Sequence, residues 1–222
     1  FIGQHLGPAF EQAKIKTKII IYDHNADRPD YPIAVLSDPL ANPYVDGSAF
    51  HLYGGQIEAL SEVHRAFPDK HLYFTEQWVG SPGNMEGDIS WHVKNLIIGA
   101  SRNWAKTVLE WNLSSNPTLT PHTDRGGCDR CLGAITITGN EIVRNPAYYV
   151  IAHASKWVDP GSTRIGSTTA KNLPNVAFIR LDGKKVLIVH NDSAKEIHFS
   201  VKESEHNFST SLAPGATGTW LW

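Results

Sequence analysis

The chain has 222 residues, of which 41% are hydrophobic, so it is long enough to bury a core in one or two domains. Its formal net charge of -2 excludes the basic surface that binds nucleic acid or an anionic membrane. No apolar run approaches the roughly 20 residues that span a bilayer, so no integral membrane segment is expected. The first residues lack an initiator Met and the pattern of a signal peptide, so Phe1 is not expected to start the gene product.

Four segments rich in β-branched and aromatic residues recur along the first half of the chain. They run over residues 17–25, 45–53, 71–78 and 105–113. Helical periodicity lies between them, over residues 55–67 and 88–104, with Asp88 as the expected N-cap of the second helix. Strands and helices that alternate at this spacing predict βα units and a parallel sheet.

The fourth unit continues through a long loop (114–134), a hairpin (134–143) and a helix (145–158) that should stop at Asp159-Pro160-Gly161. Beyond Gly161, short alternating strands with turn signals between them predict an antiparallel module. Four βα units do not close a barrel, and the Gly-rich phosphate loop of a doubly wound sheet is absent. We therefore predict an α/β fold: the C-terminal half of a (β/α)8 TIM barrel (strands 5–8, residues 1–160), followed by a small antiparallel β-sandwich domain (161–222).

Polar and aromatic groups occupy the carboxyl ends of all four predicted strands, which is where (β/α)8 barrels place catalytic groups. For two of the carboxylates, Asp23 and Glu110, a structural hydrogen bond is as good an explanation as a ligand contact. The strand ends are Asp23-His24-Asn25, His51-Leu52-Tyr53, Glu76-Gln77-Trp78 and Glu110-Trp111-Asn112.

Carboxylates beside aromatic rings, without a nucleophilic Ser elbow or a cofactor loop, favour the cleavage of glycosidic bonds. That reaction uses two carboxyl groups, and flat rings suit the apolar face of a pyranose. We expect no cofactor and no metal site, because the eleven His residues form no metal-binding motif. The single C-x-x-C pair, Cys128 and Cys131, lacks the four ligands of a structural zinc site, so it is either a short-loop disulfide or two free thiols.

Four ordered motifs carry a resemblance to glycoside hydrolase family 30, of the glucosylceramidase and endo-β-1,6-glucanase type, over nearly the whole chain. The resemblance implies a (β/α)8 barrel joined to a small β-sandwich. It also implies retaining hydrolysis, with a Glu nucleophile after the seventh strand and a Glu acid/base after the fourth. The motifs are "VDGSAFHLYGG", "KHLYFTEQWVG", "VLEWNLSSNP" with "TPHTDRGGC", and "NPAYYVIAHASKWVDPGSTRIGS".

The same resemblance implies roles for individual residues. "FTEQW" makes Glu76 the nucleophile. "FHLY" makes His51 and Tyr53 the lining of the glycone pocket, although Leu52 stands where the family often has Trp. The remaining implied substrate contacts are Asp23 through sugar hydroxyls, Gln77 and Trp78 beside the nucleophile, and Trp111 as a stacking floor with Glu110 and Asn112 next to it.

The Asn-Glu-Pro motif that holds the acid/base in this family is absent. The chain has one Asn-Glu pair, Asn140-Glu141, which is followed by Ile142 in the predicted hairpin. "FIGQHLGPAF" resembles the segment just beyond the acid/base, so we expect this chain to begin after the fourth strand. Because a leaving group without a proton donor departs slowly, the chain alone should barely hydrolyse ordinary β-glucosides.

The expected substrate is a β-glucoside, either glucosylceramide of sphingolipid metabolism or a β-1,6-glucan. The expected protein partner is the missing N-terminal half of the barrel or a second copy of the chain, since an open barrel edge invites pairing. Family habit and the possible disulfide favour a secreted or periplasmic location. The competing hypothesis is a non-catalytic carbohydrate-binding or interaction module.

Overall fold

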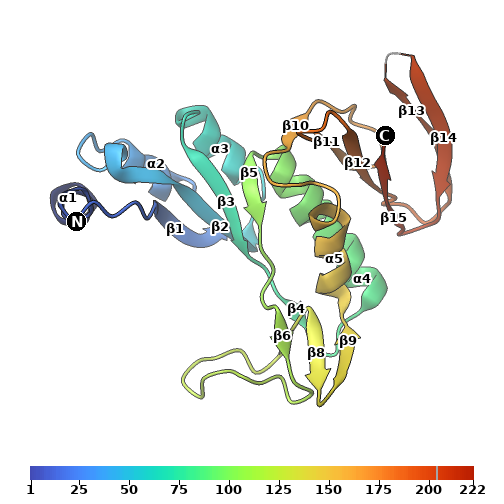
Figure 1. The fold of residues 1–222 in the computed structure, drawn as a ribbon, viewed down its shortest axis with the longest axis horizontal. Helices are drawn as coiled ribbons and strands as arrows, with labels where there is room; N and C mark the ends of the chain where they lie inside the picture. Colours follow the sequence, from blue (N-terminus) through green and yellow to red (C-terminus); the bar gives the residue numbers. More distant parts are fainter. Residues whose placement is uncertain (204) are drawn as a thin grey trace. The chain divides into compact units, whose positions relative to one another are not determined.

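A computed structural model describes residues 1–203 and 205–222 (Figure 1). The chain divides into two compact units. The N-terminal unit comprises Phe1–Gln77 and Asn103–Leu109, and the C-terminal unit comprises Trp78–Arg102 and Glu110–Trp222. In the described part of the chain, no helix is both long and apolar enough to cross a membrane.

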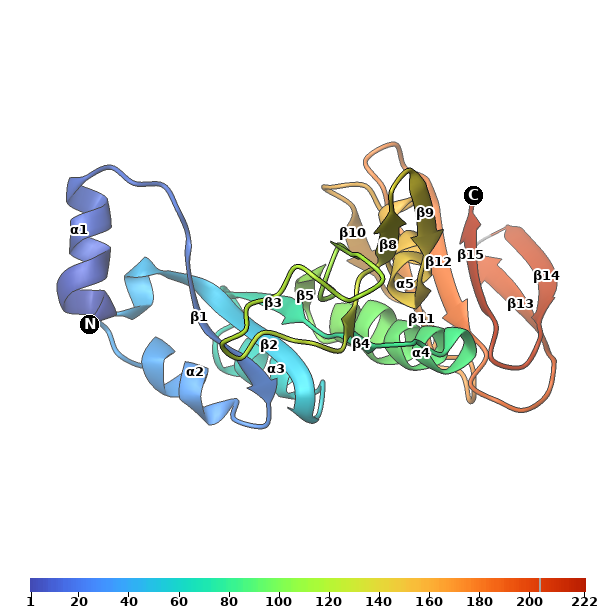
Figure 2. The ribbon, with the colours of Figure 1, turned by 90° about the horizontal axis from the view of Figure 1, so that it is seen from below.

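The N-terminal unit contains a four-stranded parallel sheet in the order β1-β2-β3-β5. This confirms the parallel βα arrangement expected from the sequence. Helix α2 packs against β1 and α3 packs against β3 (Figure 2). The strands are β1 (Ile19–Ala26), β2 (Val45–Gly55), β3 (His71–Glu76) and β5 (Ala105–Val108); the helices are η1 (Ile2–Leu6), α1 (Gly7–Gln12), α2 (Asp30–Leu36), η2 (Asn42–Tyr44) and α3 (Ala59–Ala66).

The core of this unit lies on the central strands β2 and β3. Phe50 and Phe74 are fully buried, and burial of each such ring stabilises the fold by about 1.5–3 kcal/mol. The two strands also approach closely at Gly47, where an added Cβ would lie 2.0 Å from the His71 carbonyl oxygen. Only glycine permits that approach, so the sequence at Gly47 sets the spacing of the strands that carry the site.

Two strands end earlier than the sequence predicts. β3 ends at Glu76 rather than at Trp78, and β5 ends at Val108 rather than at Leu113. After one further residue in each case the chain enters the C-terminal unit, where Trp78 and Trp111 form an isolated parallel bridge. Strand propensity alone does not show where a chain leaves one compact unit for the next.

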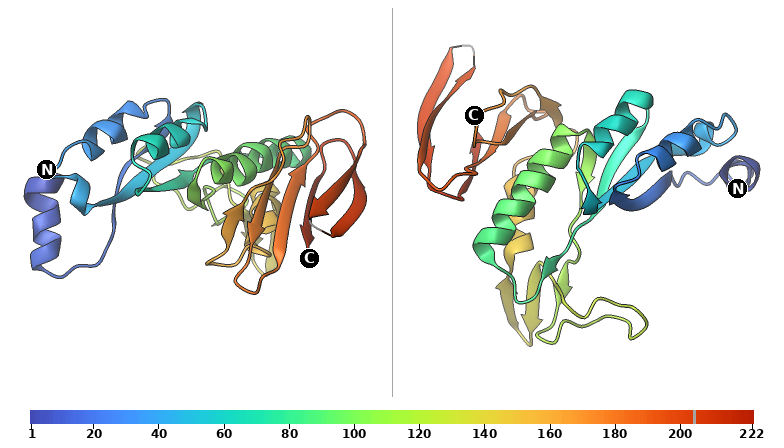
Figure 3. Two further views of the ribbon diagram at one scale, coloured as in Figure 1. Left: turned by 90° about the horizontal axis from the view of Figure 1, so that it is seen from above. Right: turned by 180° about the vertical axis from the view of Figure 1, so that it is seen from behind.

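In the C-terminal unit, α4 (Met85–His92) continues into the π-helix η3 (Val93–Ala100), and α4 packs beside α5 (Pro146–Ser155) (Figure 3). The predicted hairpin is confirmed as β8 (Ile135–Thr138) and β9 (Glu141–Arg144). β8 also pairs with β6 (Ser114–Ser115), and β4 (Val79–Gly80) pairs with β7 (Cys131–Leu132).

Two helix boundaries differ from the prediction. Asp88 is not the N-cap of α4, because Asn84 holds that place: its Oδ1 accepts from Gly87 N–H at 2.9 Å. Asp88 lies within the first turns of α4, and its Oδ2 accepts a hydrogen bond from the backbone N–H of Asn84 at 2.6 Å. α5 ends at Ser155, before the Asp159-Pro160-Gly161 turn that was expected to stop it.

We expect Asn84→Ala to lower the free energy of unfolding by about 1 kcal/mol, because Ala cannot accept the Gly87 N–H. Urea denaturation followed by circular dichroism measures the loss. Met85→Ala is the matched control, since Met85 is half-exposed at the first helical position and should change stability by less than about 0.5 kcal/mol. Equal losses from the two variants would contradict this capping role.

The antiparallel module is also present in the C-terminal unit. β10 (Thr163–Ile165), β11 (Asn175–Ile179), β12 (Lys185–His190) and β15 (Thr217–Leu221) form one sheet, and β13 (Ile197–Glu203) and β14 (His206–Leu212) form another. Leu187 and Val189 of the first sheet join Leu212 of the second in one apolar cluster. β14 escaped prediction because its sequence "HNFSTSL" is mostly polar.

Two histidines, the buried His190 and the partly buried His153, join the helices of this unit to its first sheet. His190 Nε2 lies 3.0 Å from the Ser90 hydroxyl and its Nδ1 lies 3.0 Å from that of Thr217. His153 on α5 contacts the Thr219 hydroxyl at 3.0 Å. Burial lowers the pKa of both imidazoles below the ordinary value of 6.5, so the folded unit favours their neutral forms.

Stability of the C-terminal unit should therefore fall as the pH drops below about 6.5, because the unfolded chain then binds protons that the folded chain resists. Above that pH both states hold neutral imidazoles and no penalty arises. Urea midpoints at pH 7.5 and 5.5 measure the effect, and His153→Gln should reduce the difference. An unchanged midpoint between the two pH values would contradict the linkage.

Candidate active site

Three neighbouring parallel strands bring four of the predicted site residues together in the N-terminal unit. Asp23 lies on β1, His51 and Tyr53 lie on β2, and Glu76 is the last residue of β3. His51 and Glu76 are register partners across a bulge between β2 and β3. The shared carboxyl end of these strands explains why residues far apart in sequence meet there.

Glu76 is held through one of its two carboxylate oxygens. The Tyr53 hydroxyl donates to Oε1 at 3.1 Å, and His51 Nδ1 faces the same oxygen at 4.0 Å. The Glu76 side chain is 33% exposed, whereas the His51 side chain is only 12% exposed. The carboxylate is thus oriented by its neighbours and still open to a ligand.

Asp23 is connected to Glu76 through His51. One oxygen of Asp23, Oδ1, accepts from His51 Nε2 at 3.1 Å and from the Thr75 hydroxyl at 2.7 Å. Sequence reasoning placed Asp23 at the site but gave no role to Thr75. Thr75 stands next to Glu76 in the sequence, but its hydrogen-bond partner Asp23 lies 52 residues away, so only the fold shows the contact.

The backbone at the end of β1 is bent to present Asp23. Tyr22 and Asp23 have φ angles of 77° and 54°, and the pairing of β1 with β2 is irregular between Tyr22 and His24. Left-handed conformations of non-glycine residues cost about 1–3 kcal/mol each and concentrate at functional sites. The Tyr22 hydroxyl donates to the Asn25 carbonyl oxygen and steadies the bend; burial, and then Asp27, raises the pKa of Tyr22.

The other predicted site residues lie in the C-terminal unit, apart from Gln77. Trp111 is 47% exposed. Glu110 is different, because its side chain is only 3% exposed and His92 Nδ1 donates to both of its oxygens at 2.8 and 3.0 Å. This hydrogen-bonded pair favours the structural alternative that the sequence left open for Glu110.

Two amide side chains among the predicted site residues have an unused acceptor. Gln77 Oε1 and Asn112 Oδ1 are buried and have no hydrogen-bond partner among the described residues. A buried polar atom without a partner is costly and normally gains one from water or a ligand. Each of these amides therefore offers an acceptor to a hydroxyl group.

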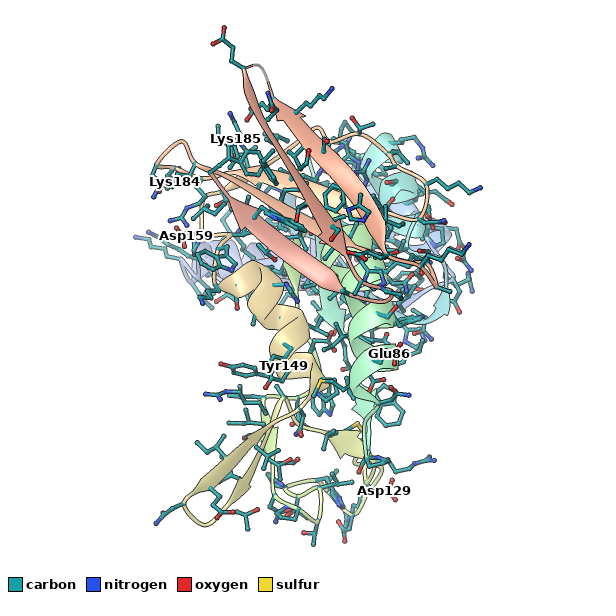
Figure 4. The ribbon with its side chains drawn as sticks, turned by 90° about the vertical axis from the view of Figure 1, so that its right-hand side faces the viewer. Glu86, Asp129, Tyr149, Asp159, Lys184 and Lys185 are labelled. Carbon is teal, nitrogen blue, oxygen red and sulfur yellow. A yellow bond between two sulfur atoms is a disulfide. The ribbon has the colours of Figure 1, made fainter. Side chains whose placement is uncertain are left out.

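The two cysteines form a disulfide, Cys128–Cys131, so of the two states allowed by the sequence the structure has the bonded one. It closes the short turn that contains Asp129, labelled in Figure 4. Cys131 lies on β7, and next to that pairing the Ser81 N–H donates to the Arg130 carbonyl oxygen at 2.8 Å. The bond thus fixes the turn beside β4.

A cavity of about 750 Å³ lies within the C-terminal unit, lined by residues of both sheets such as Leu187, Phe199 and Trp222. The carboxylate in its lining, Glu203, is paired with Lys185 and with the Trp222 Nε1–H. We place the candidate active site at Glu76 because glycosidic chemistry needs an accessible carboxylate.

Within the described residues, no group of three or more His, Cys, Asp or Glu side chains could hold a metal ion.

A separate polar network lies at the amino end of the parallel sheet in the N-terminal unit. Asp46 pairs with Lys18 at 2.7 Å and accepts from the Tyr73 hydroxyl. Burial and this hydrogen bond raise the pKa of Tyr73 to about 12. Because active sites of parallel barrels form at the carboxyl end, we leave this network out of the candidate site.

Parallel strands that carry polar and aromatic groups toward their carboxyl ends, in a chain that also contains an antiparallel β module, are typical of enzymes with a (β/α)8 barrel and an added β domain. The glycosyl hydrolase family 30 TIM-barrel domain matches residues 1–158, and the glycosyl hydrolase family 30 beta sandwich domain matches residues 161–220. The chain therefore belongs to glycosyl hydrolase family 30. The predicted combination of barrel and sandwich and the family resemblance are both confirmed.

Individual relatives fit this assignment. The chain is 32% identical over 230 residues to endo-1,6-beta-D-glucanase neg1 of Aspergillus fumigatus, covering 99% of the chain and 46% of the relative. It is 29% identical over 241 residues to mouse lysosomal acid glucosylceramidase, covering 100% of the chain and 46% of the relative. The solved structure of the endo-beta1,6-glucanase BT3312 superposes with a TM-score of 0.90 at 31% identity, covering 100% of the chain and 51% of that structure. The chain thus spans about half the length of these relatives.

Proposed function

We propose that this glycosidase chain supplies the nucleophile of a retaining β-glucosidase site, and that the nucleophile is Glu76. The observation that carries the proposal is the orientation of Glu76, whose Oε1 is held by Tyr53 while the side chain stays 33% exposed. The Tyr53 hydroxyl engages Oε1, so we assign Oε2 as the attacking oxygen. Oε2 bonds to the anomeric carbon as the leaving-group oxygen takes the electron pair of the broken bond.

The substrate class in this proposal is a β-glucoside. Relatives are named as endo-1,6-beta-glucanases and as a glucosylceramidase, and both names denote a bond made by a glucosyl group. The residues proposed to contact this sugar are those predicted from the sequence except Glu110, which is hydrogen-bonded to His92. They are Asp23, His51, Tyr53, Gln77, Trp78, Trp111 and Asn112. The exposed ring of Trp111 provides the stacking surface, and the unused acceptors of Gln77 and Asn112 suit sugar hydroxyls.

A proton donor for the leaving group is also part of the proposal. The chain has no Asn-Glu-Pro motif, and its one Asn-Glu pair lies in the β8–β9 hairpin, where Glu141 begins β9. We therefore propose that the acid/base comes from another polypeptide segment, either the first half of a barrel or a second copy of the chain. We further propose that the barrel part ends at residue 160, and that the Cys128–Cys131 disulfide reflects a secreted or periplasmic location.

Covalent labelling tests the nucleophile directly. With 2,4-dinitrophenyl 2-deoxy-2-fluoro-β-D-glucoside, we expect the intact mass to rise by one fluoroglucosyl group, and peptide mapping should place the group on Glu76. The dinitrophenolate departs as an anion without protonation, so this labelling reaction needs no general acid. Binding of the sugar without any covalent adduct would favour the non-catalytic carbohydrate-binding module instead.

A further inference from the structure

The hydrogen bonds around His51 determine which of its ring nitrogens carries a proton. A carboxylate only accepts, so the contact of 3.1 Å between His51 Nε2 and Asp23 Oδ1 requires a proton on Nε2. The opposite nitrogen, Nδ1, then faces Glu76 Oε1 at 4.0 Å. The ring thus stands between two carboxylates, with its orientation set from the Asp23 side.

Thr75 fixes Asp23 in turn. The Thr75 hydroxyl donates to the same oxygen that His51 uses, at 2.7 Å. Thr75 is also the residue before Glu76 on β3, so the strand that carries the nucleophile also holds the group that orients its neighbour. The left-handed backbone at Tyr22 and Asp23 turns the Asp23 carboxylate toward both donors.

We propose that Thr75 and Asp23 are positioning residues that fix the tautomer and orientation of His51 beside Glu76. The exposure of the Asp23 side chain supports a role in the site rather than in stability: Asp23 is 64% exposed, whereas its partner His51 is 12% exposed. An ion pair with so exposed a carboxylate adds little to folding, yet the backbone is strained to form it. The proposal rests on the proposed function of Glu76 and adds residues that act on it through His51.

NMR resonances of the His51 imidazole test the positioning role of Asp23 independently of any reaction. Long-range ¹H–¹⁵N spectra of the protein should show His51 with its proton on Nε2, and Asp23→Ala should shift the ring nitrogens toward a mixture of tautomers. Asp23→Asn keeps an acceptor oxygen and should largely restore the wild-type pattern. Unchanged His51 resonances in Asp23→Ala would overturn the proposal.

Labelling kinetics with the fluoro-glucoside provide the second readout. Asp23→Ala and Thr75→Val should lower the first-order rate constant of inactivation, up to about 100-fold for a misplaced group, with a smaller change in inactivator affinity. Thr75→Ser should recover most of the rate. The matched control is Thr107→Val, an exposed Thr on β5 of the same unit, which should leave the rate unchanged.

The outcomes separate the two proposals. If Glu76 is labelled and both Asp23→Ala and Thr75→Val react at the wild-type rate, the positioning role of Asp23 and Thr75 is overturned and the nucleophile assignment stands. If the wild-type protein takes no label on Glu76, the proposed function fails. The His51 resonances alone then test the positioning role: a shift in Asp23→Ala supports it, and no shift overturns it.

Discussion

Glu76→Gln should abolish formation of the fluoroglucosyl adduct, slowing it by several orders of magnitude. The amide has nearly the shape of the carboxylate but lacks its nucleophilic electron density and its negative charge. The Tyr53 hydroxyl can still donate to the amide oxygen, so the fold around the position should persist. Intact-protein mass spectrometry after incubation with the 2,4-dinitrophenyl fluoro-glucoside measures the result.

The matched control is Glu58→Gln, an exposed carboxylate at the start of α3 in the same unit, which should label at the wild-type rate. Denaturation curves of the two variants show whether either has lost its fold. Continued labelling in Glu76→Gln would assign the nucleophile to another carboxylate. Because Glu110 is held by His92 and almost fully buried, we expect no label there in either variant.

The parallel strands and the helix α3 were predictable because their segments carry apolar patterns of their own. β2 and β3 have apolar residues on both faces, as buried parallel strands do. The helix α2 was missed because Pro32 lies inside it, in a short segment whose sequence resembles a turn. The helix predicted over residues 88–104 is present as α4 and η3, but the π form of η3 was not predicted, because apolar spacing does not separate a π-helix from an α-helix.

The grouping of the candidate site was predictable only for residues that lie toward the carboxyl ends of strands. Asp23, His51, Tyr53 and Glu76 were predicted to lie together because parallel strands bring their carboxyl ends together, and they do contact one another. The bond from Thr75 to Asp23 depends on the left-handed turn at the end of β1, and nothing in the local sequence forces Tyr22 or Asp23 into that conformation. The pairing of Glu110 with His92 depends on packing within the C-terminal unit, which periodicity does not reveal.

The rate of attack by Glu76 should depend steeply on the leaving group when the 222-residue chain acts alone. A positioned general acid contributes about 10²–10⁴-fold, and that contribution is largest for alkoxides, which leave poorly without a proton. The groups that contact Glu76 in the N-terminal unit are Tyr53 and His51, and neither corresponds to the second carboxyl of a retaining pair.

We therefore expect 2,4-dinitrophenyl β-glucoside to glycosylate Glu76 at a measurable rate. Alkyl β-glucosides should react about 10²–10⁴-fold slower with this chain than with an enzyme that has its general acid in place. Burst kinetics across a series of aryl and alkyl glucosides measure the dependence. Glu141→Gln is the control, because the exposed Glu141 belongs to the chain's one Asn-Glu pair and its loss should change nothing. A flat dependence on the leaving group would show that the chain already contains its proton donor, and a loss of rate in Glu141→Gln would identify that donor.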